Sequence, residues 1–179
     1  MTATDAAATD RTGPVVVLIG SPGAGKSSVG RRVAEALGVP FADTDQLVEA
    51  ASGMSVSDIF ITHGEDEFRR REAAAVAEAL KAQSGVVSLG GGAVMREATR
   101  ELLQGSRVVW LRVSLADAAH RVGMNTARPL LLGNVRATLS GMLEQRNPVY
   151  EAVATDIVDT SGRSVREVTE AIVGMVRGD

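Results

Sequence analysis

Gly20-Ser-Pro-Gly-Ala-Gly-Lys26-Ser27 decides the fold, because an apolar run precedes it and a helical pattern follows it. The preceding run, Val15 to Ile19, is continuous and mostly β-branched, which is typical of a strand buried on both faces. After the glycine-rich stretch, apolar residues recur at helical spacing until Gly38, which predicts the end of a helix there. A strand, a glycine-rich loop and a helix in this order predict a phosphate-binding loop.

The chemistry of this loop indicates a phosphotransferase that uses ATP and Mg²⁺. Closely spaced glycines let backbone N–H groups converge on phosphate oxygens, and the helix that follows adds the positive end of its dipole. Lys26 is expected to reach the β and γ phosphates, and the Ser27 hydroxyl to ligate Mg²⁺. The glycines do not follow the Gly-x-Gly-x-x-Gly pattern of dinucleotide-binding folds, which argues against a nicotinamide enzyme. The nucleotide-binding residues predicted here are Gly23, Ala24, Gly25, Lys26, Ser27 and Ser28.

The composition favours one globular domain. The chain has 179 residues, of which 45% are apolar and 23% charged, and it contains no cysteine. A net charge of −3 gives no global attraction for nucleic acid or anionic membrane, so we expect neither as a partner. The absence of cysteine excludes disulfides and thiolate metal sites. We expect a disordered tail over residues 1–13, a single domain over 14–179 and a cytoplasmic location.

Strand-like and helical patterns alternate along the rest of the chain. This alternation predicts an α/β fold with three layers, in which helices cover both faces of a central, mostly parallel five-stranded sheet. Ligands of such sheets bind beyond the carboxyl ends of the strands. The long loop from Gly123 to Asn134 is a candidate lid. Further strands are predicted at 86–89, 108–113 and 157–158, and further helices at 67–81 and 164–177.

Further motifs follow the phosphate loop in a set order, and together they resemble the shikimate kinase family. The resemblance covers about Val15 to Arg177. In that family ATP phosphorylates the 3-hydroxyl of shikimate, on the route to chorismate. The resemblance implies the P-loop kinase fold, a substrate-binding helical region at about 44–72, a lid at about 123–134, one Mg²⁺ per subunit and a monomer. The motifs are Asp43-Thr-Asp45, Phe68-Arg69-Arg70, Gly90-Gly91-Gly92, Arg128-Pro129-Leu130 and Arg146 near Tyr150.

The two aspartates after the second strand match an acidic pair of the family. Asp45 matches the residue that orients the acceptor hydroxyl, and whether it also removes the proton stays open. Asp43 matches the acidic residue near Mg²⁺. The alternative is structural, with one aspartate capping a helix and the other in its first turn. One aspartate can cap the helix while the other acts in catalysis.

Arg69 and Arg146 match the arginines that hold the shikimate carboxylate in that family. Arginine suits this role because a planar guanidinium offers two parallel hydrogen bonds to a carboxylate. The alternative for Arg69 is a solvated helix surface with internal ion pairs, which is the interpretation we keep for Arg70 and Arg71.

The glycines from Gly90 to Gly92 match a loop that uses the amide of Gly91 for shikimate, and the alternative is a tight turn. Arg128 matches the lid arginine that stabilises charge on the transferred phosphoryl group, and an ordinary loop arginine is the alternative. Arg121 and Arg163 match residues that flank the adenine.

Two other functions fit parts of the sequence. A gluconate or nucleoside monophosphate kinase would share the fold, and a regulatory module could bind ATP without phosphorylating a metabolite. Paired arginines, an aspartate and a glycine loop suit a small carboxylated polyol better than a nucleobase. His63, His120 and Trp110 have no partners that suggest chemistry, so we expect them at the surface or in packing.

Overall fold

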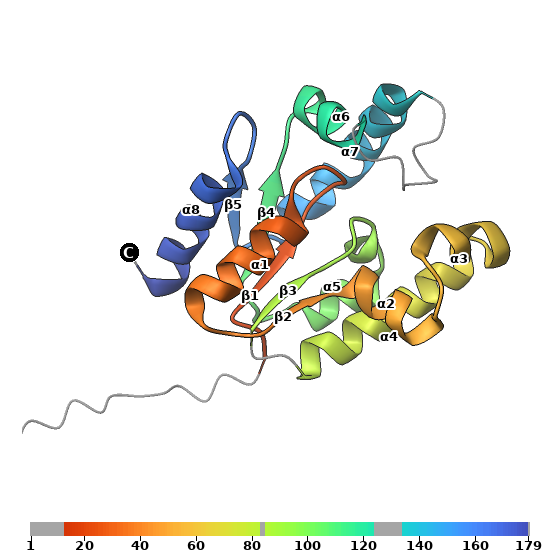
Figure 1. Ribbon diagram of the computed structural model, residues 1–179, viewed down its shortest axis with the longest axis horizontal. Coiled ribbons are helices and arrows are strands. Elements are labelled where there is room, and N and C mark those ends of the chain that lie inside the picture. Colours follow the sequence, from red (N-terminus) through yellow and green to blue (C-terminus); the bar gives the residue numbers. More distant parts are fainter. Residues whose placement is uncertain (1–12, 83–84, 124–133, 179) are drawn as a thin grey trace, which may run out of the picture.

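The computed structural model describes residues 13–82, 85–123 and 134–178. Its centre is a five-stranded sheet with the strand order β2-β3-β1-β4-β5 (Figure 1). Every neighbouring pair of strands in this sheet is parallel. The elements are β1 (Val16–Ile19), α1 (Lys26–Leu37), β2 (Phe41–Asp43), α2 (Thr44–Ser52), α3 (Val56–His63), α4 (Glu65–Ala82), β3 (Val86–Ser88), the short 3₁₀ helix η1 (Ala93–Met95), α5 (Glu97–Leu102), β4 (Val108–Arg112), α6 (Leu115–Gly123), α7 (Val135–Val153), β5 (Asp156–Asp159) and α8 (Val165–Arg177).

Strand β1 lies in the middle of the sheet. All of its residues are buried, as the apolar run predicts for a strand covered on both faces. Its Leu18 pairs with Ser88 of β3 on one side and with Val109 of β4 on the other. The phosphate-loop motif therefore leaves the sheet at its centre, between the loops that follow the neighbouring strands.

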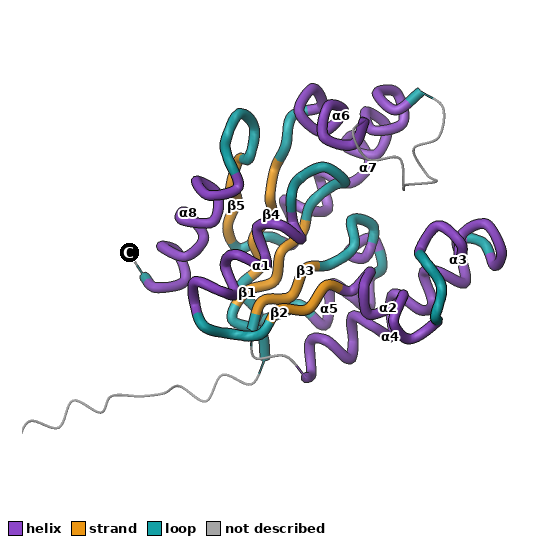
Figure 2. The backbone as a smooth tube through the Cα atoms, viewed as in Figure 1, coloured by secondary structure: helices purple, strands orange, loops and turns teal. Residues whose placement is uncertain are grey.

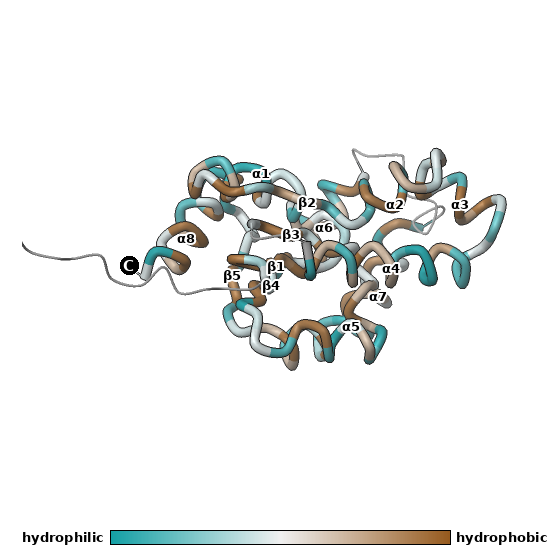
Figure 3. Tube along the Cα trace, turned by 90° about the horizontal axis from the view of Figure 1, so that it is seen from below, coloured by the Kyte–Doolittle hydropathy of each residue, from teal (hydrophilic) through white to brown (hydrophobic). Residues whose placement is uncertain are grey.

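Helices cover both faces of the sheet, which confirms the three-layer prediction. Helices α1 and α8 pack on one face through a core that includes Val33, Val168 and Ile172. Helices α4 and α5 and the end of α7 pack on the other face, where Val76, Leu103 and Tyr150 are buried. Figure 3 shows the apolar strands as a layer between these two sets of helices.

Helices α2 and α3 project beyond the sheet edge and pack on α4, as Figure 2 shows. Their small core contains Val48, Ile59, Phe68 and Ala75. Among the residues described, no helix is long and apolar enough to span a bilayer.

The elements whose bounds were predicted from the sequence lie within two residues of their predicted positions. Helix α1 begins and ends where its pattern does, and α8 begins after Ser164, which caps it. The strand β5 is longer than the weak pattern at 157–158 indicated, because it pairs along β4. Most of the predicted tail and of the predicted lid, including Arg128, lies outside the described residues.

Candidate active site

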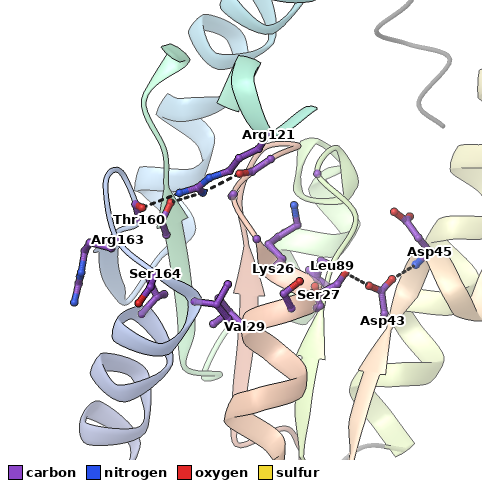
Figure 4. Close-up of a pocket in the computed structure, with 18 residues that line it drawn as sticks. Lys26, Ser27, Val29, Asp43, Asp45, Leu89, Arg121, Thr160, Arg163 and Ser164 are labelled. Carbon is purple, nitrogen blue, oxygen red and sulfur yellow. Dashed lines mark hydrogen bonds between the residues drawn. The ribbon is translucent and has the colours of Figure 1, made fainter. Parts of the chain in front are cut away.

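A cavity of about 670 Å³ opens at the carboxyl ends of the strands. Its lining comes from the loops after β1, β3 and β5, from the ends of β2 and β3, and from α1, α2, α6 and α8, so segments far apart in sequence meet there. Figure 4 shows Asp43 and Asp45 at one end, Lys26 and Ser27 in the middle, and Arg163 at the other end. All the predicted nucleotide-binding residues within the described chain line this cavity: Gly23, Ala24, Gly25, Lys26, Ser27, Ser28, Arg121 and Arg163.

The backbone of the phosphate loop adopts a conformation at Gly23 that requires glycine. Gly23 has a φ of 82°, and a Cβ there would lie 3.0 Å from the backbone oxygen of Ala118. A side chain at this position would therefore suffer both backbone strain and a close contact. The Lys26 ammonium group donates to the backbone oxygens of Gly20 at 2.7 Å and Ser21 at 3.2 Å, which keeps it over the loop.

The two predicted metal-binding residues are in contact. The Ser27 hydroxyl donates to Oδ2 of Asp43 at 2.5 Å. The other oxygen, Oδ1, accepts from the N–H groups of Asp45 at 2.9 Å and Gln46 at 3.3 Å, so Asp43 also caps α2. Capping uses one oxygen and leaves the second facing Ser27, so the structural and metal-binding interpretations are compatible.

This pair fits Mg²⁺ better than a transition metal. A hydroxyl and a carboxylate are hard oxygen ligands, and Mg²⁺ is usually held by one or two protein groups with water and substrate phosphates. Within the described ranges, no group of three or more histidine, aspartate or glutamate residues could hold a metal alone.

The far end of the cavity is built around Arg121. Its guanidinium donates to the backbone oxygen of Gly23 at 3.0 Å and to the hydroxyl and backbone oxygens of Thr160 at 3.2 and 3.0 Å (Figure 4). Arg121 therefore joins the phosphate loop to the loop after β5. Arg163 is in that second loop and donates to the backbone oxygen of Asp159.

The loop Gly90 to Gly92 is surrounded by charged side chains. A Cβ on Gly90 would lie 2.6 Å from Oε2 of Glu72 and 2.8 Å from Oδ1 of Asp45. A Cβ on Gly91 would lie 3.1 Å from Nη1 of Arg146, and one on Gly92 would lie 2.6 Å from both terminal nitrogens of Arg69. The predicted acceptor-binding residues Asp45, Arg69 and Arg146 thus come together on this loop, which has no room for side chains of its own.

Glu72 is a member of this cluster that sequence reasoning missed. It is only 3% exposed, and its Oε1 accepts from Nη1 of Arg69 at 2.9 Å. Its Oε2 is buried without a hydrogen-bond partner among the described residues. Burial raises the pKa of Glu72, and the nearby Asp45 carboxylate adds to this, while Arg69 and Arg146 oppose it. The only sequence signal was its place one helical turn after Arg69, which also fits a surface ion pair.

Two further residues hold the glycine loop. The Tyr150 hydroxyl, on a fully buried side chain, donates to the backbone oxygen of Gly91 at 2.5 Å. The hydroxyl of Thr44, next to Asp43 and Asp45, accepts from the N–H of Gly90 at 3.0 Å. Burial raises the pKa of Tyr150, so it stays a hydrogen-bond donor at neutral pH.

A second cavity of about 340 Å³ adjoins the same loop. Gly92, Arg69, Glu72 and Arg146 line it, whereas Gly91 and Asp45 line the large cavity. The Gly90 to Gly92 loop therefore borders both cavities, with the arginines on the side of the smaller cavity and Asp45 on the side of the larger one.

The other residues singled out in the sequence lie in surface ion pairs, in packing or at the exposed surface. Arg70 and Arg71 both pair with Glu67, and these pairs lower the pKa of Glu67 to about 2. Trp110 is buried against the Tyr150 ring, and His63 and His120 are exposed.

Comparison with known proteins gives a consistent result. The family model described as shikimate kinase matches residues 22–177. A shikimate kinase of Thermobifida fusca is 55% identical over 159 residues, which cover 89% of this chain and 92% of that protein. One of Salinispora tropica is 52% identical over 163 residues, covering 91% and 98%. The solved structure of shikimate kinase from Acinetobacter baumannii in complex with shikimate superimposes with a TM-score of 0.88, at 33% identity and 93% coverage of both chains.

Proposed function

The chain belongs to the shikimate kinase family, and on that premise we propose that it transfers the γ-phosphate of ATP to the 3-hydroxyl of shikimate. The observation that carries the proposal is that the phosphate-loop residues and the acceptor-binding residues meet at the Gly90 to Gly92 loop. Gly91 lines the cavity that contains the phosphate loop, and a Cβ on the same glycine would touch Arg146. A donor phosphate and an anionic acceptor could therefore approach each other across Gly91.

The donor half binds ATP through the phosphate loop. Backbone N–H groups of residues 23–28 surround the phosphates, and Lys26 turns from its backbone oxygens to the β and γ phosphates. Ser27 and Asp43 would hold one Mg²⁺, which supplies charge neutralisation on the phosphate oxygens. Arg121 and Arg163 flank the adenine at the far end of the cavity.

The acceptor half binds shikimate through opposite charges and a hydroxyl partner. Arg69 and Arg146 hold its carboxylate, and the amide of Gly91 donates to shikimate. Asp45 orients the 3-hydroxyl toward the γ-phosphorus and receives its proton as the new P–O bond forms and the bond to ADP breaks. Because the phosphoryl transition state is loose, orientation contributes more than proton removal.

Arg128, outside the described residues, completes the proposal. We assign to it the stabilisation of charge on the transferred phosphoryl group, in a segment that closes over the site and excludes water. A monomeric enzyme acting in the cytoplasm is the remaining part of the proposal.

An assay of ADP release with different acceptors tests this function. We expect release that requires Mg²⁺ and shikimate together, with no stimulation by gluconate or by nucleoside monophosphates. Lys26→Ala should abolish it, and Asp45→Asn should lower kcat much more than it changes the KM for shikimate. Activity with gluconate or a nucleotide in place of shikimate would contradict the proposal. ATP binding without any acceptor-dependent turnover would instead favour a regulatory module.

A further inference from the structure

The wall of the large cavity around Thr160 to Ser164 consists of a loop that carries little apolar packing of its own. Of this loop, only Thr160 is buried, and Gly162, Arg163 and Ser164 are exposed. Thr160, Arg163 and Ser164 all line the cavity. What holds the loop in position therefore has to come from hydrogen bonds to neighbouring elements.

Those hydrogen bonds come from the first turn of α6. Ser114 precedes this helix, and its hydroxyl accepts from the N–H of Asp117 at 3.2 Å, as an N-cap does. Asp117 occupies the third position of the helix, from which an acidic side chain usually bonds back to the N–H of the cap residue. Here it does not, because Oδ2 of Asp117 accepts from the N–H of Gly162 at 2.7 Å.

The N–H of Ser114 is satisfied from the same loop. It donates to the hydroxyl of Ser161 at 2.8 Å. The reciprocal half of a capping box is thus replaced by two hydrogen bonds that cross from α6 to the loop after β5. Helix α8 shows the ordinary arrangement, in which Ser164 and Glu167 close the box between themselves.

The other end of α6 contacts the same loop. Arg121, one turn after Asp117, donates to Thr160 and to Gly23 of the phosphate loop. Helix α6 therefore sets the separation between the phosphate loop and the loop after β5. Asp117 is the charged residue of α6 that contacts the exposed part of the loop after β5.

We propose that Asp117 is a positioning residue for the nucleotide, which acts by fixing the loop Thr160 to Ser164 against the base end of the bound ATP. The inference rests on the proposed function, because it takes the base to lie at this end of the cavity. Asp117 itself does not line the cavity. Its effect should be confined to the base and ribose, since the phosphates are held by the loop after β1, whereas the Asp117 carboxylate accepts from Gly162 in the loop after β5.

The test compares two ligands of the same site by calorimetric titration. ADP reports on the phosphate and base ends together, whereas inorganic tripolyphosphate reports on the phosphate loop alone. Asp117→Ala should weaken ADP binding by about fivefold to fiftyfold, the range expected when a charge-assisted hydrogen bond that orders a loop is lost. Tripolyphosphate should bind the variant as tightly as it binds the wild-type protein. Steady-state kinetics should show the same split, with a higher KM for ATP and an unchanged KM for shikimate.

Two further variants make the result specific. Asp117→Asn keeps an oxygen acceptor for Gly162, so ADP affinity should return to within about threefold of wild type. Glu35→Ala, which removes an exposed carboxylate near the far end of α1, should change neither ligand's affinity.

Unchanged ADP affinity in Asp117→Ala would overturn the inference. Equal weakening of ADP and tripolyphosphate, or loss of folding at the assay temperature, would also overturn it, because Asp117 would then support the whole fold. If the wild-type protein bound neither ligand, the proposed function would fail first.

Discussion

Gly92→Ala tests whether the absence of a side chain at Gly92 leaves the space that the Arg69 guanidinium needs. Gly92 has φ −95° and ψ −1°, which alanine adopts without strain, so the substitution changes little except the added methyl group. That methyl would lie 2.6 Å from Nη1 and Nη2 of Arg69. This is about 1 Å short of a normal contact of roughly 3.5 Å. Because a guanidinium at the end of a flexible side chain moves more easily than backbone, Arg69 should be displaced by about that distance.

The expected effect is on the acceptor and not on folding. A displacement of about 1 Å at a positioning group lowers kcat/KM for shikimate by about tenfold to a hundredfold, equivalent to about 1.4 to 2.8 kcal/mol. The KM for ATP should be unchanged, and the free energy of unfolding should change by less than about 1 kcal/mol. Coupled ADP-release kinetics with each substrate varied in turn, together with thermal unfolding, measure all three quantities.

A matched glycine provides the control. A Cβ on Gly174, in α8, meets no atom within 4 Å. Gly174→Ala should therefore leave the kinetics unchanged and stabilise the helix slightly. The reasoning would be refuted if Gly92→Ala kept the wild-type kcat/KM for shikimate, or if it raised the KM for ATP and for shikimate equally.

Three other substitutions test neighbouring parts of the site. Tyr150→Phe leaves the backbone oxygen of Gly91 without the Tyr150 hydroxyl as a donor. The free energy of unfolding, measured by chemical denaturation, should fall by about 1 to 3 kcal/mol, and the KM for shikimate should rise. An unchanged free energy of unfolding would contradict this. Glu72→Gln removes a carboxyl whose pKa is raised by burial above the usual 4.5, so that ionisation of Glu72 destabilises the folded wild-type protein as pH rises. The Tm of wild type minus that of Glu72→Gln should therefore fall as the pH rises above 4.5, and a difference that stays constant with pH would contradict a raised pKa for Glu72. Arg146→Ala should raise the KM for shikimate at least tenfold, and Arg146→Lys should recover only part of the loss, since an ammonium group lacks the planar fork; full recovery would argue for simple charge attraction.

Local chemistry explains what the sequence predicted well. The phosphate loop, its strand and its helix are continuous in sequence, so spacing alone located them. Asp43 and Asp45 are also neighbours, and both the capping and the metal-binding interpretations of Asp43 agree with its contacts.

The spacing of residues in the sequence could not predict which distant segments contact one another. Nothing in the chain between Arg69 and Arg146 indicates that both reach one glycine loop, and only the resemblance to a family paired them. Glu72 was missed because its burial depends on the packing of α4 against that loop, whereas its sequence neighbourhood is a mixed-charge helix. The cross-loop contact of Asp117 was hidden in the same way, since Ser-x-x-Asp also describes an ordinary helix start.

The most direct test of the central claim is the identity of the phosphorylated product, measured by ³¹P and ¹H NMR in a reaction that contains ATP, Mg²⁺ and shikimate. The meeting of the donor and acceptor residues at Gly91 predicts one shikimate 3-phosphate for each ADP. ADP formed with inorganic phosphate and unmodified shikimate, or phosphate on a different hydroxyl, would contradict it.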